Sequence, residues 1–263
     1  MKSNREKSEM RKNGNSLVNF VNTVYPPVLL IMFLLIFWQT VCSVNNIQVW
    51  MLAKPTDIFS KFAANTKDIL PHIGITYSNI LIGLVLAVVI GLLIAVITCS
   101  FPVAGAALTP ITVSLCCIPM VTLVPTLMLI FGVGRSVKLI TIVIQAFPIV
   151  TMNAATGFLN ADPAHLELMQ SLKANKFQQF KYCLMMDALP DIFTGIKLSS
   201  IMAMMGGITA EMTGGNQGLG SRISFYIGFS KTPEALSCII YIAFLGALLY
   251  SLISLIEKKT VRQ

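Results

Sequence analysis

Residues that could perform chemistry are few in this sequence, and they are not arranged as a catalytic site. His72 and His165 are its only histidines, and no Ser/His/Asp set can be assembled around either of them. The acidic pair Asp187 and Asp191 has no evident histidine or cysteine partner. We therefore interpret the two as polar residues that flank an apolar segment. The pattern GxxxxGK[ST] is also missing, which excludes a P-loop nucleotide site. We therefore expect no enzymatic activity in this chain.

The six cysteines do not form a metal or redox motif. Five of them lie inside or at the ends of apolar segments, and Cys183 lies in a polar loop. No CxxC pair occurs, and no histidine stands at metal-ligand spacing. Free cysteine in such positions behaves as a small apolar side chain. We predict neither a metal site nor a cofactor.

One polar segment, residues 160–191, carries the pattern of a docking element. Asp162-Pro163 is a strong helix start, because Asp caps a helix and Pro suits its first position. About two helical turns should follow, from His165 to Leu172. We then predict an interruption at Ala174-Asn175, with Asn175 capping a second short helix over residues 176–185.

The second short helix should present an apolar face. Phe177, Phe180 and Leu184 stand at i, i+3 and i+7, so they should share one side of it. The unit should end at Leu189-Pro190, before the next apolar segment. A helix–break–helix with an apolar knob is suited to docking a cytoplasmic partner, and the alternative is an amphipathic hairpin lying on a bilayer.

A second group of residues could line a route through the apolar segments. Such a route needs polar groups or irregular backbone among apolar side chains. Pro119 and Pro125 should break a helix and free carbonyl groups, and Gln145 and Asn153 are uncharged hydrogen-bond donors. Gly206-Gly207 permits close approach of helices. The alternative for each of these residues is ordinary helix packing.

Glu211 is the only carboxylate close to the apolar part of a span. It could line an outer gate of the route. It could instead pin the loop at residues 214–220 by accepting backbone N–H groups.

The composition indicates a polytopic α-helical membrane protein. The 263 residues are 55% hydrophobic and 11% charged, whereas soluble domains carry about 25% charged residues. Stretches of 41 and 66 residues, from Asn13 to Ala53 and from Ile69 to Gly134, contain no charged side chain. Since a span needs roughly 20 apolar residues and Ser100-Phe101-Pro102 divides the longer stretch, we predict six spans, near residues 25–44, 75–99, 107–131, 136–157, 192–212 and 235–256.

The distribution of Lys and Arg favours cytoplasmic termini. Eleven basic residues fall on the side of the termini and of the 160–191 segment, against seven on the other side. The net charge of +8 then suits anionic lipid headgroups of the bilayer. Nucleic acid is not an expected partner, because the basic residues are scattered over both sides.

The predicted organisation is one membrane domain with short polar ends. A basic cytoplasmic segment covers residues 1–24, the membrane domain covers 25–256, and a cytoplasmic tail covers 257–263. We interpret the first apolar segment as an uncleaved anchor, because no small-x-small cleavage pattern follows it. Pro55 should open a short helix lying on the outer membrane surface, with a plain loop as the alternative.

At residues 160–191 the sequence resembles the EAA loop of ABC importer permeases. Glu167 fills the position of the family's Glu, with Leu168 and Met169 in place of its two alanines and Ala174 just beyond. Lys173 stands where the family has Gly, which suggests a turn with φ above zero that Lys adopts less readily. Leu189 and Pro190 match the family's Leu-Pro.

Other stretches resemble the same family, and they occur in the family's order along the chain. The resemblance is closest to the branch of permeases for nitrate, sulfonates, taurine, bicarbonate and thiamine-related pyrimidines. The stretches are His72 to Thr76 with Gly83, Ile118-Pro119, Leu123 to Pro125, Ile130 to Gly134, Phe147 to Ile149 with Asn153, Ala210 to Met212, and Gly218 to Gly220.

The resemblance implies a type I ABC importer permease fold in a bacterial cytoplasmic membrane. The chain would supply the substrate pathway and the coupling helices, as a homodimer or with a close paralogue. Cytoplasmic ATPase subunits would bind the EAA loop at Glu167, Leu168, Met169, Lys173, Ala174, Phe177, Phe180, Leu189 and Pro190. An extracytoplasmic binding protein would deliver substrate. A secondary, ion-coupled transporter is the alternative, although no ionisable residue stands in the middle of a span.

Overall fold

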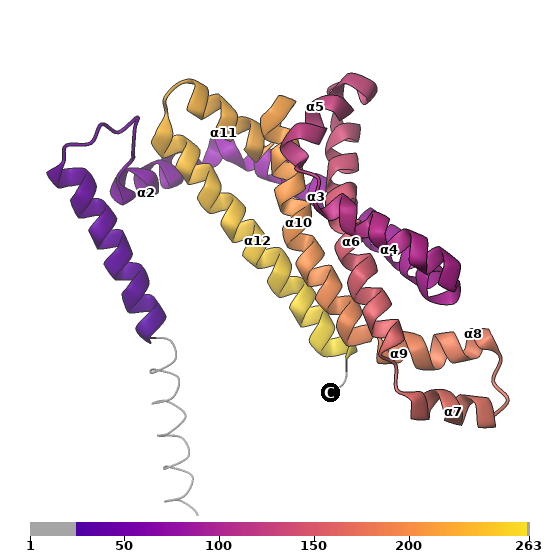
Figure 1. Cartoon of the computed structure of the whole chain (residues 1–263). Helices are drawn as coiled ribbons and strands as arrows, with labels where there is room; N and C mark the ends of the chain where they lie inside the picture. Colours follow the sequence, from indigo (N-terminus) through magenta and orange to yellow (C-terminus); the bar gives the residue numbers. More distant parts are fainter. Residues whose placement is uncertain (1–24, 262–263) are drawn as a thin grey trace, which may run out of the picture.

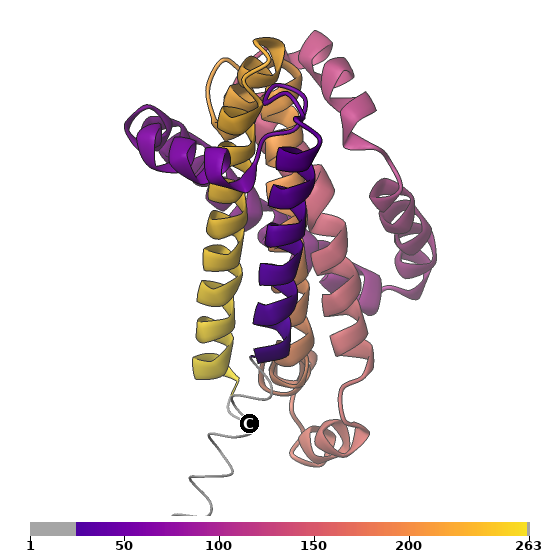
Figure 2. The same cartoon turned by 90° about the vertical axis from the view of Figure 1, so that its left-hand side faces the viewer.

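The computed structural model describes residues 25–261 and forms a bundle of long helices (Figures 1 and 2). The predicted basic segment 1–24 lies outside the described residues, as do residues 262–263 of the predicted tail. Within residues 25–261 the regular structure is entirely helical. Its elements are the helix Tyr25–Val44, α2 Pro55–Ala64, α3 Thr66–Ser100, α4 Pro102–Cys116, α5 Met120–Phe131, α6 Arg135–Leu159, α7 Pro163–Ser171, α8 Lys176–Gln179, the π-helix η1 Phe180–Leu184, α9 Met185–Asp187, α10 Leu189–Gly214, α11 Leu219–Gly228 and α12 Thr232–Thr260.

Five helices are long and apolar enough to cross a membrane, and each contains or coincides with one predicted span. They are the helix Tyr25–Val44, α3, α6, α10 and α12. The predicted break at Ser100-Phe101-Pro102 is present, because Phe101 separates α3 from α4.

The predicted third span, residues 107–131, is not one continuous helix. It consists of α4 and α5, which are bent by 100° relative to each other. Pro119 lies at the break, as predicted, and its missing N–H and fixed φ favour the start of α5 there. Pro125 does not break the chain, since α5 runs through it.

The bundle is centred on α6, which packs against both α3 and α10. Glycines allow these helices to approach closely: a Cβ atom on Gly91 of α3 would lie 2.7 Å from Val150 Cβ, and one on Gly195 of α10 would lie 2.8 Å from Asn153 Cβ. Small residues at such crossings are typical of membrane bundles. The core of these helices is accordingly rigid enough to position polar groups at both ends.

The two ends of the bundle carry different elements. The C-terminus and the segment α7–α9 lie at one end, and α2, α5 and α11 lie at the other (Figure 1). The α2 helix begins at Pro55 as predicted. Its Phe62 stacks on Tyr241 of α12 at 4.2 Å between ring centroids, and the Tyr241 hydroxyl donates to the Phe62 carbonyl. These contacts attach the α2 helix to α12 of the bundle.

Candidate functional site

The segment between α6 and α10 begins and breaks at the predicted residues. The Asp162 side chain accepts the N–H of Ala164 at 2.8 Å, and Pro163 takes the first helical position of α7. Asn175 caps α8 in a reciprocal arrangement with Gln178, with both hydrogen bonds at 2.9 Å. Both helix starts are thus stabilised by side chains close in sequence.

The turn between α7 and α8 places Lys173 in the left-handed region, with φ of 54°. The Ala174 N–H donates to the Met169 carbonyl at 3.0 Å, and the Lys173 N–H donates to the Gln170 carbonyl at 2.8 Å. These two bonds form a Schellman motif, the helix ending that usually has Gly at this position. The positive φ expected from the resemblance is therefore confirmed, and Lys adopts it.

Replacing this lysine should relax the turn. Lys173→Gly removes the steric cost of the left-handed conformation, roughly 1–2 kcal/mol, while the greater freedom of unfolded Gly offsets about 0.5–1 kcal/mol of that gain. We expect the Ala174 amide to exchange its hydrogen a few-fold more slowly than in the native chain. Lys173→Val, β-branched at the same site, should speed exchange. Faster exchange in the glycine variant would contradict the strain assigned to Lys173.

Phe177 and Phe180, predicted to form one exposed apolar face, differ in burial. The expected single helix over residues 176–185 is divided into α8, the π-helix η1 and α9, and the π-helical turn begins at Phe180. Phe180 points into the bundle and packs on Phe158 at 5.5 Å between centroids. Phe177 is 71% exposed.

Leu168 of α7 and Leu172, the C-cap of that helix, accompany Phe177 as exposed apolar side chains of this segment. Leu168 and Leu172 stand one helical turn apart, and both are well exposed, Leu172 at 69%. We call Leu168, Leu172 and Phe177 the loop apolar set. Glu167 on α7 is also exposed. Leu189 and Pro190, expected to end the unit, instead form the first turn of α10.

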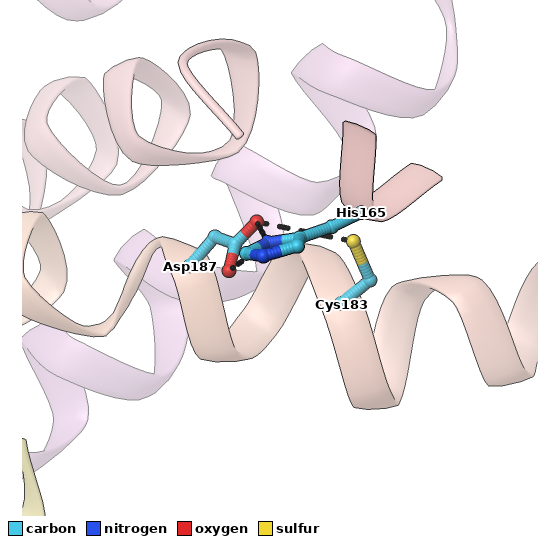
Figure 3. A group of neighbouring side chains, drawn as sticks. All are labelled: His165, Cys183 and Asp187. Carbon is cyan, nitrogen blue, oxygen red and sulfur yellow. Dashed lines mark hydrogen bonds and ion pairs between the residues drawn. The ribbon is translucent and has the colours of Figure 1, made fainter. Parts of the chain in front are cut away.

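Asp187, interpreted from sequence as lacking partners, has both a histidine and a cysteine beside it (Figure 3). His165 Nδ1 lies 2.9 Å from Asp187 Oδ2, and Cys183 Sγ lies 3.9 Å from the same oxygen. The hydrogen bond that His165 donates to Asp187 and the charge of Asp187 raise the pKa of His165. Burial, followed by the Asp187 charge, raises the pKa of Cys183. The sequence could not show this group, because α7 and α9 meet only through the fold of the loop.

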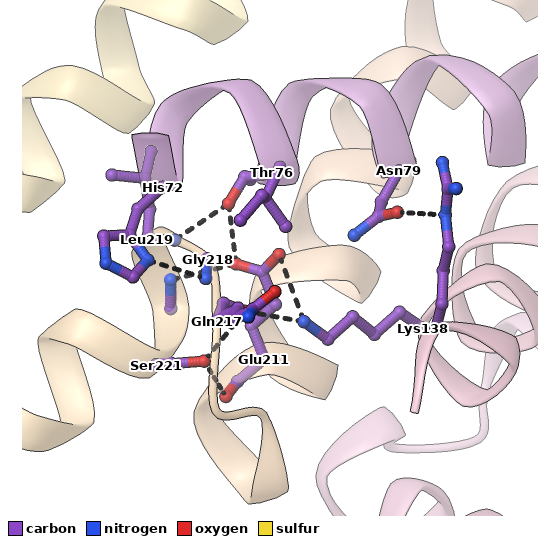
Figure 4. A network of polar contacts seen from close by, with 12 residues as sticks. His72, Thr76, Asn79, Lys138, Glu211, Gln217, Gly218, Leu219 and Ser221 are labelled. Carbon is purple, nitrogen blue, oxygen red and sulfur yellow. Dashed lines mark hydrogen bonds and ion pairs between the residues drawn. The ribbon is translucent and has the colours of Figure 1, made fainter. Parts of the chain in front are cut away.

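At the opposite end of the bundle, Glu211 is 1% exposed and anchors a buried polar network (Figure 4). Its carboxylate accepts the Thr76 hydroxyl at 2.8 Å and the Gly220 N–H at 3.0 Å. Of its two predicted roles, pinning the 214–220 loop is therefore confirmed. Being buried, it does not line an open gate in this chain.

Lys138 and His72 extend the same network. Lys138 is 7% exposed, lies 3.8 Å from Glu211 as an ion pair and donates to the Gln217 carbonyl at 2.6 Å. His72 accepts the Gly218 N–H at 3.1 Å. Gly218 has φ of 114°, and a Cβ there would collide with the Glu211 carboxylate. The loop before α11 is thus tied to α3, α6 and α10.

A cavity of about 340 Å³ opens beside this network. It lies between α3, α5, the start of α6 and the loop that follows α10, and its lining includes Asn79, Arg135, Lys138, Asn216 and Gln217. Arg135 donates to Asn79 at 2.9 Å. Within residues 25–261 Arg135 makes no ion pair with a carboxylate. The cavity therefore carries a surplus of positive charge.

Comparison with protein families now decides what kind of membrane protein carries these features. Residues 87–262 match the family described as binding-protein-dependent transport system inner membrane component. The chain belongs to this family. It is a membrane permease subunit of an ABC importer, and the alternative of an ion-coupled secondary transporter finds no support.

Individual relatives agree with this permease assignment. The chain is 27% identical over 227 residues to a Bacillus subtilis protein described as an aliphatic sulfonates transport permease, covering 86% of this chain and 82% of that protein. It is 26% identical to the formylaminopyrimidine transport permease of Halalkalibacterium halodurans, covering 88% and 93%. A structure of the MetNI methionine ABC transporter in inward-facing conformations shares the fold, with 20% identity, a TM-score of 0.65 and coverage of 74% and 96%. The expected branch and fold are confirmed.

The remaining predicted pathway residues of the permease lie mostly in helix contacts. Asn153 donates to the Ile149 carbonyl of its own helix at 2.8 Å. Gly207 faces Ile142 of α6 and Ile80 of α3. Gln145, by contrast, has a buried Oε1 with no hydrogen-bond partner. Of these three, Gln145 alone has a buried polar side-chain atom without a hydrogen-bond partner.

Neither the helix α11 nor the cavity beside the Glu211 network was predicted from the sequence. In the sequence analysis Arg135 and Lys138 are only two of the seven basic residues counted on the side away from the termini, although their i, i+3 spacing at the start of a span was a usable signal. The helix α11 has only ten residues between two spans, and its start at Leu219 depends on the Thr76 hydroxyl, which accepts the Leu219 N–H at 2.8 Å.

Proposed function

We propose that this permease subunit passes the movement of a cytoplasmic ATPase to its membrane helices through the segment α7–α9. The observation that carries the proposal is the loop apolar set, three large apolar side chains exposed on a capped segment at the end of the bundle. Water disfavours such side chains unless a partner covers them. Membership in a binding-protein-dependent importer family supplies the class of partner.

Within this segment, each predicted coupling residue receives a proposed role. Glu167, exposed on α7, pairs with a basic residue of the ATPase. Leu168, Leu172 and Phe177 enter an apolar pocket on it, and Met169 with Lys173 and Ala174 form the turn that presents them. Phe180 acts as a positioning residue through Phe158. Leu189 and Pro190 connect the segment to α10.

The opposite end of the bundle is the proposed side of substrate delivery by a binding protein. The cavity with Arg135 and Lys138 favours a small anion, and the sulfonate permease among the relatives agrees with that charge. Two permease subunits, identical or closely paralogous, would enclose the route between them. Gln145 is the pathway residue whose unpaired Oε1 suits a position on that route. The α4–α5 break at Pro119 is the proposed point of movement.

The function is tested by ATP turnover with and without the ATPase. The purified chain alone should hydrolyse no ATP, and reconstitution with its ATPase and binding protein in liposomes should give substrate-stimulated hydrolysis and uptake. The control is a reconstitution whose ATPase subunit carries an inactive P-loop. Turnover by the single chain, free of contaminating ATPases, would contradict the proposal, as would uptake that persists without ATP.

The proposed orientation places both termini and α7–α9 in the cytoplasm. Five basic residues near the α7–α9 end of the bundle support it, namely Lys173, Lys176, Lys181, Lys258 and Lys259. On a cysteine-free background, Thr260→Cys should be protected from a membrane-impermeant thiol reagent in intact cells, whereas Ser230→Cys, next to α11, should be labelled. The reverse pattern would overturn the orientation.

A further inference from the structure

His165, Cys183 and Asp187 are three different metal-ligand types brought together from two parts of one loop (Figure 3). One ligand atom from each lies within 4.8 Å of the other two. Tetrahedral zinc with bonds of about 2.0–2.3 Å holds its ligand atoms about 3.3–3.8 Å apart. The observed separations of 2.9 Å and 3.9 Å from the Asp187 oxygen therefore need only small side-chain adjustments.

The local fold already orients this group. Cys183 and Asp187 are four residues apart across the end of the π-helix η1, which places both side chains on the same side. The Asp162 N–H donates to Asp187 Oδ2 at 3.3 Å and helps fix that carboxylate, as hydrogen bonds to metal-ligating side chains do. Cys183 is 3% exposed, so its thiol faces Asp187 rather than solvent.

The donor set selects the metal. A thiolate, an imidazole nitrogen and a carboxylate oxygen suit Zn²⁺, whereas Mg²⁺ and Ca²⁺ prefer oxygen ligands alone. The His165 side chain is 56% exposed, which leaves the solvent side free for a water molecule as fourth ligand. On binding, the Cys183 thiol would release its proton to solvent and the thiolate would bond to the metal.

We propose that His165, Cys183 and Asp187 form a zinc site that clamps α7 onto α9 at the base of α10. His165 belongs to α7, which carries Leu168 and is capped by Leu172, and Asp187 lies two residues before α10 begins. A bound metal would join these two elements directly. The site itself does not depend on the proposed coupling function.

The test uses the purified full chain in detergent, reduced, freed of metal by a chelator and carrying no histidine tag. Co²⁺ serves as the probe, because thiolate ligation gives a near-ultraviolet charge-transfer band and tetrahedral geometry gives visible bands. We expect one equivalent of Co²⁺ to bind and to be displaced by Zn²⁺. Cys183→Ser should abolish the charge-transfer band, and His165→Gln should raise the Co²⁺ dissociation constant at least tenfold.

The matched control is Cys117→Ser, which removes an exposed thiol elsewhere in the chain and should leave the Co²⁺ spectrum unchanged. Absence of the charge-transfer band in the native chain would overturn the proposal, whether or not any variant folds. A band that survives Cys183→Ser, or is lost in Cys117→Ser, would overturn it too. In those cases the group is an ion pair between His165 and Asp187 beside a packed cysteine.

Discussion

Leu172→Ala combined with Phe177→Ala is expected to release the ATPase subunit from the permease during purification. The two side chains are 69% and 71% exposed, so the chain itself does not bury them, and in the proposed complex the ATPase covers them. Covering each is worth about 1.5–3 kcal/mol. Their joint loss should weaken docking at least about a hundredfold, since 1.4 kcal/mol changes affinity tenfold. Co-purification of ATPase with the tagged permease, followed by a titration in detergent, measures the effect.

The matched control is Phe229→Ala, which removes an equally large side chain, 65% exposed, at the opposite end of the bundle. It should leave the amount of bound ATPase unchanged. Phe180→Ala is unsuitable as a docking test, because its contact with Phe158 makes a loss of stability the first effect. If the double variant retains a full complement of ATPase and transports normally, the loop apolar set rests on the bilayer instead.

Glu211→Gln should strongly destabilise the permease. The amide keeps the shape of the side chain and can still accept from Thr76 and Gly220, but it removes the negative charge beside Lys138. Leaving one member of a buried ion pair uncompensated costs about 3–5 kcal/mol. The variant should therefore unfold at a clearly lower temperature, or in less denaturant, than the native chain in the same detergent.

Adding Lys138→Met to Glu211→Gln provides the decisive comparison. The second change removes the uncompensated charge and keeps an unbranched side chain of similar length. We expect the double variant to recover a large part of the lost stability, with a positive coupling energy between the two sites. A double variant no more stable than the single one would show that the uncompensated charge of Lys138 is not the cause of the instability.

Local signals in the sequence were sufficient for much of the fold. Charge-free stretches identified the spans, and Asp162, Pro163 and Asn175 placed the helix starts of the loop, because caps depend on residues close in sequence. The positive φ at Lys173 followed from the family's glycine. These features needed no knowledge of distant contacts.

The features that the sequence did not predict have a common physical reason. Contacts between residues far apart in the sequence determine them. A uniform helical period predicts one exposed face for Phe177 and Phe180, whereas Phe180 packs on Phe158 and begins a π-helical turn that no residue type announces. Likewise, His165 and Asp187 are 22 residues apart in sequence. Glu211 and Thr76 are 135 apart. Hydrogen bonds across such distances could not be read from spacing.

The pairing of Lys138 with Glu211 also constrains how the chain is made. The helix that bears Lys138 leaves the ribosome well before the one that bears Glu211, and at about 5–20 residues per second the interval lasts several seconds. During that time a lysine close to the apolar zone has no acidic partner, and a charge there is costly. Until α10 is synthesised, we expect the Lys138 ammonium group of the nascent permease to stay hydrated at the membrane edge. Chains stalled at this stage would present an unmatched cation to the insertion machinery and to membrane proteases.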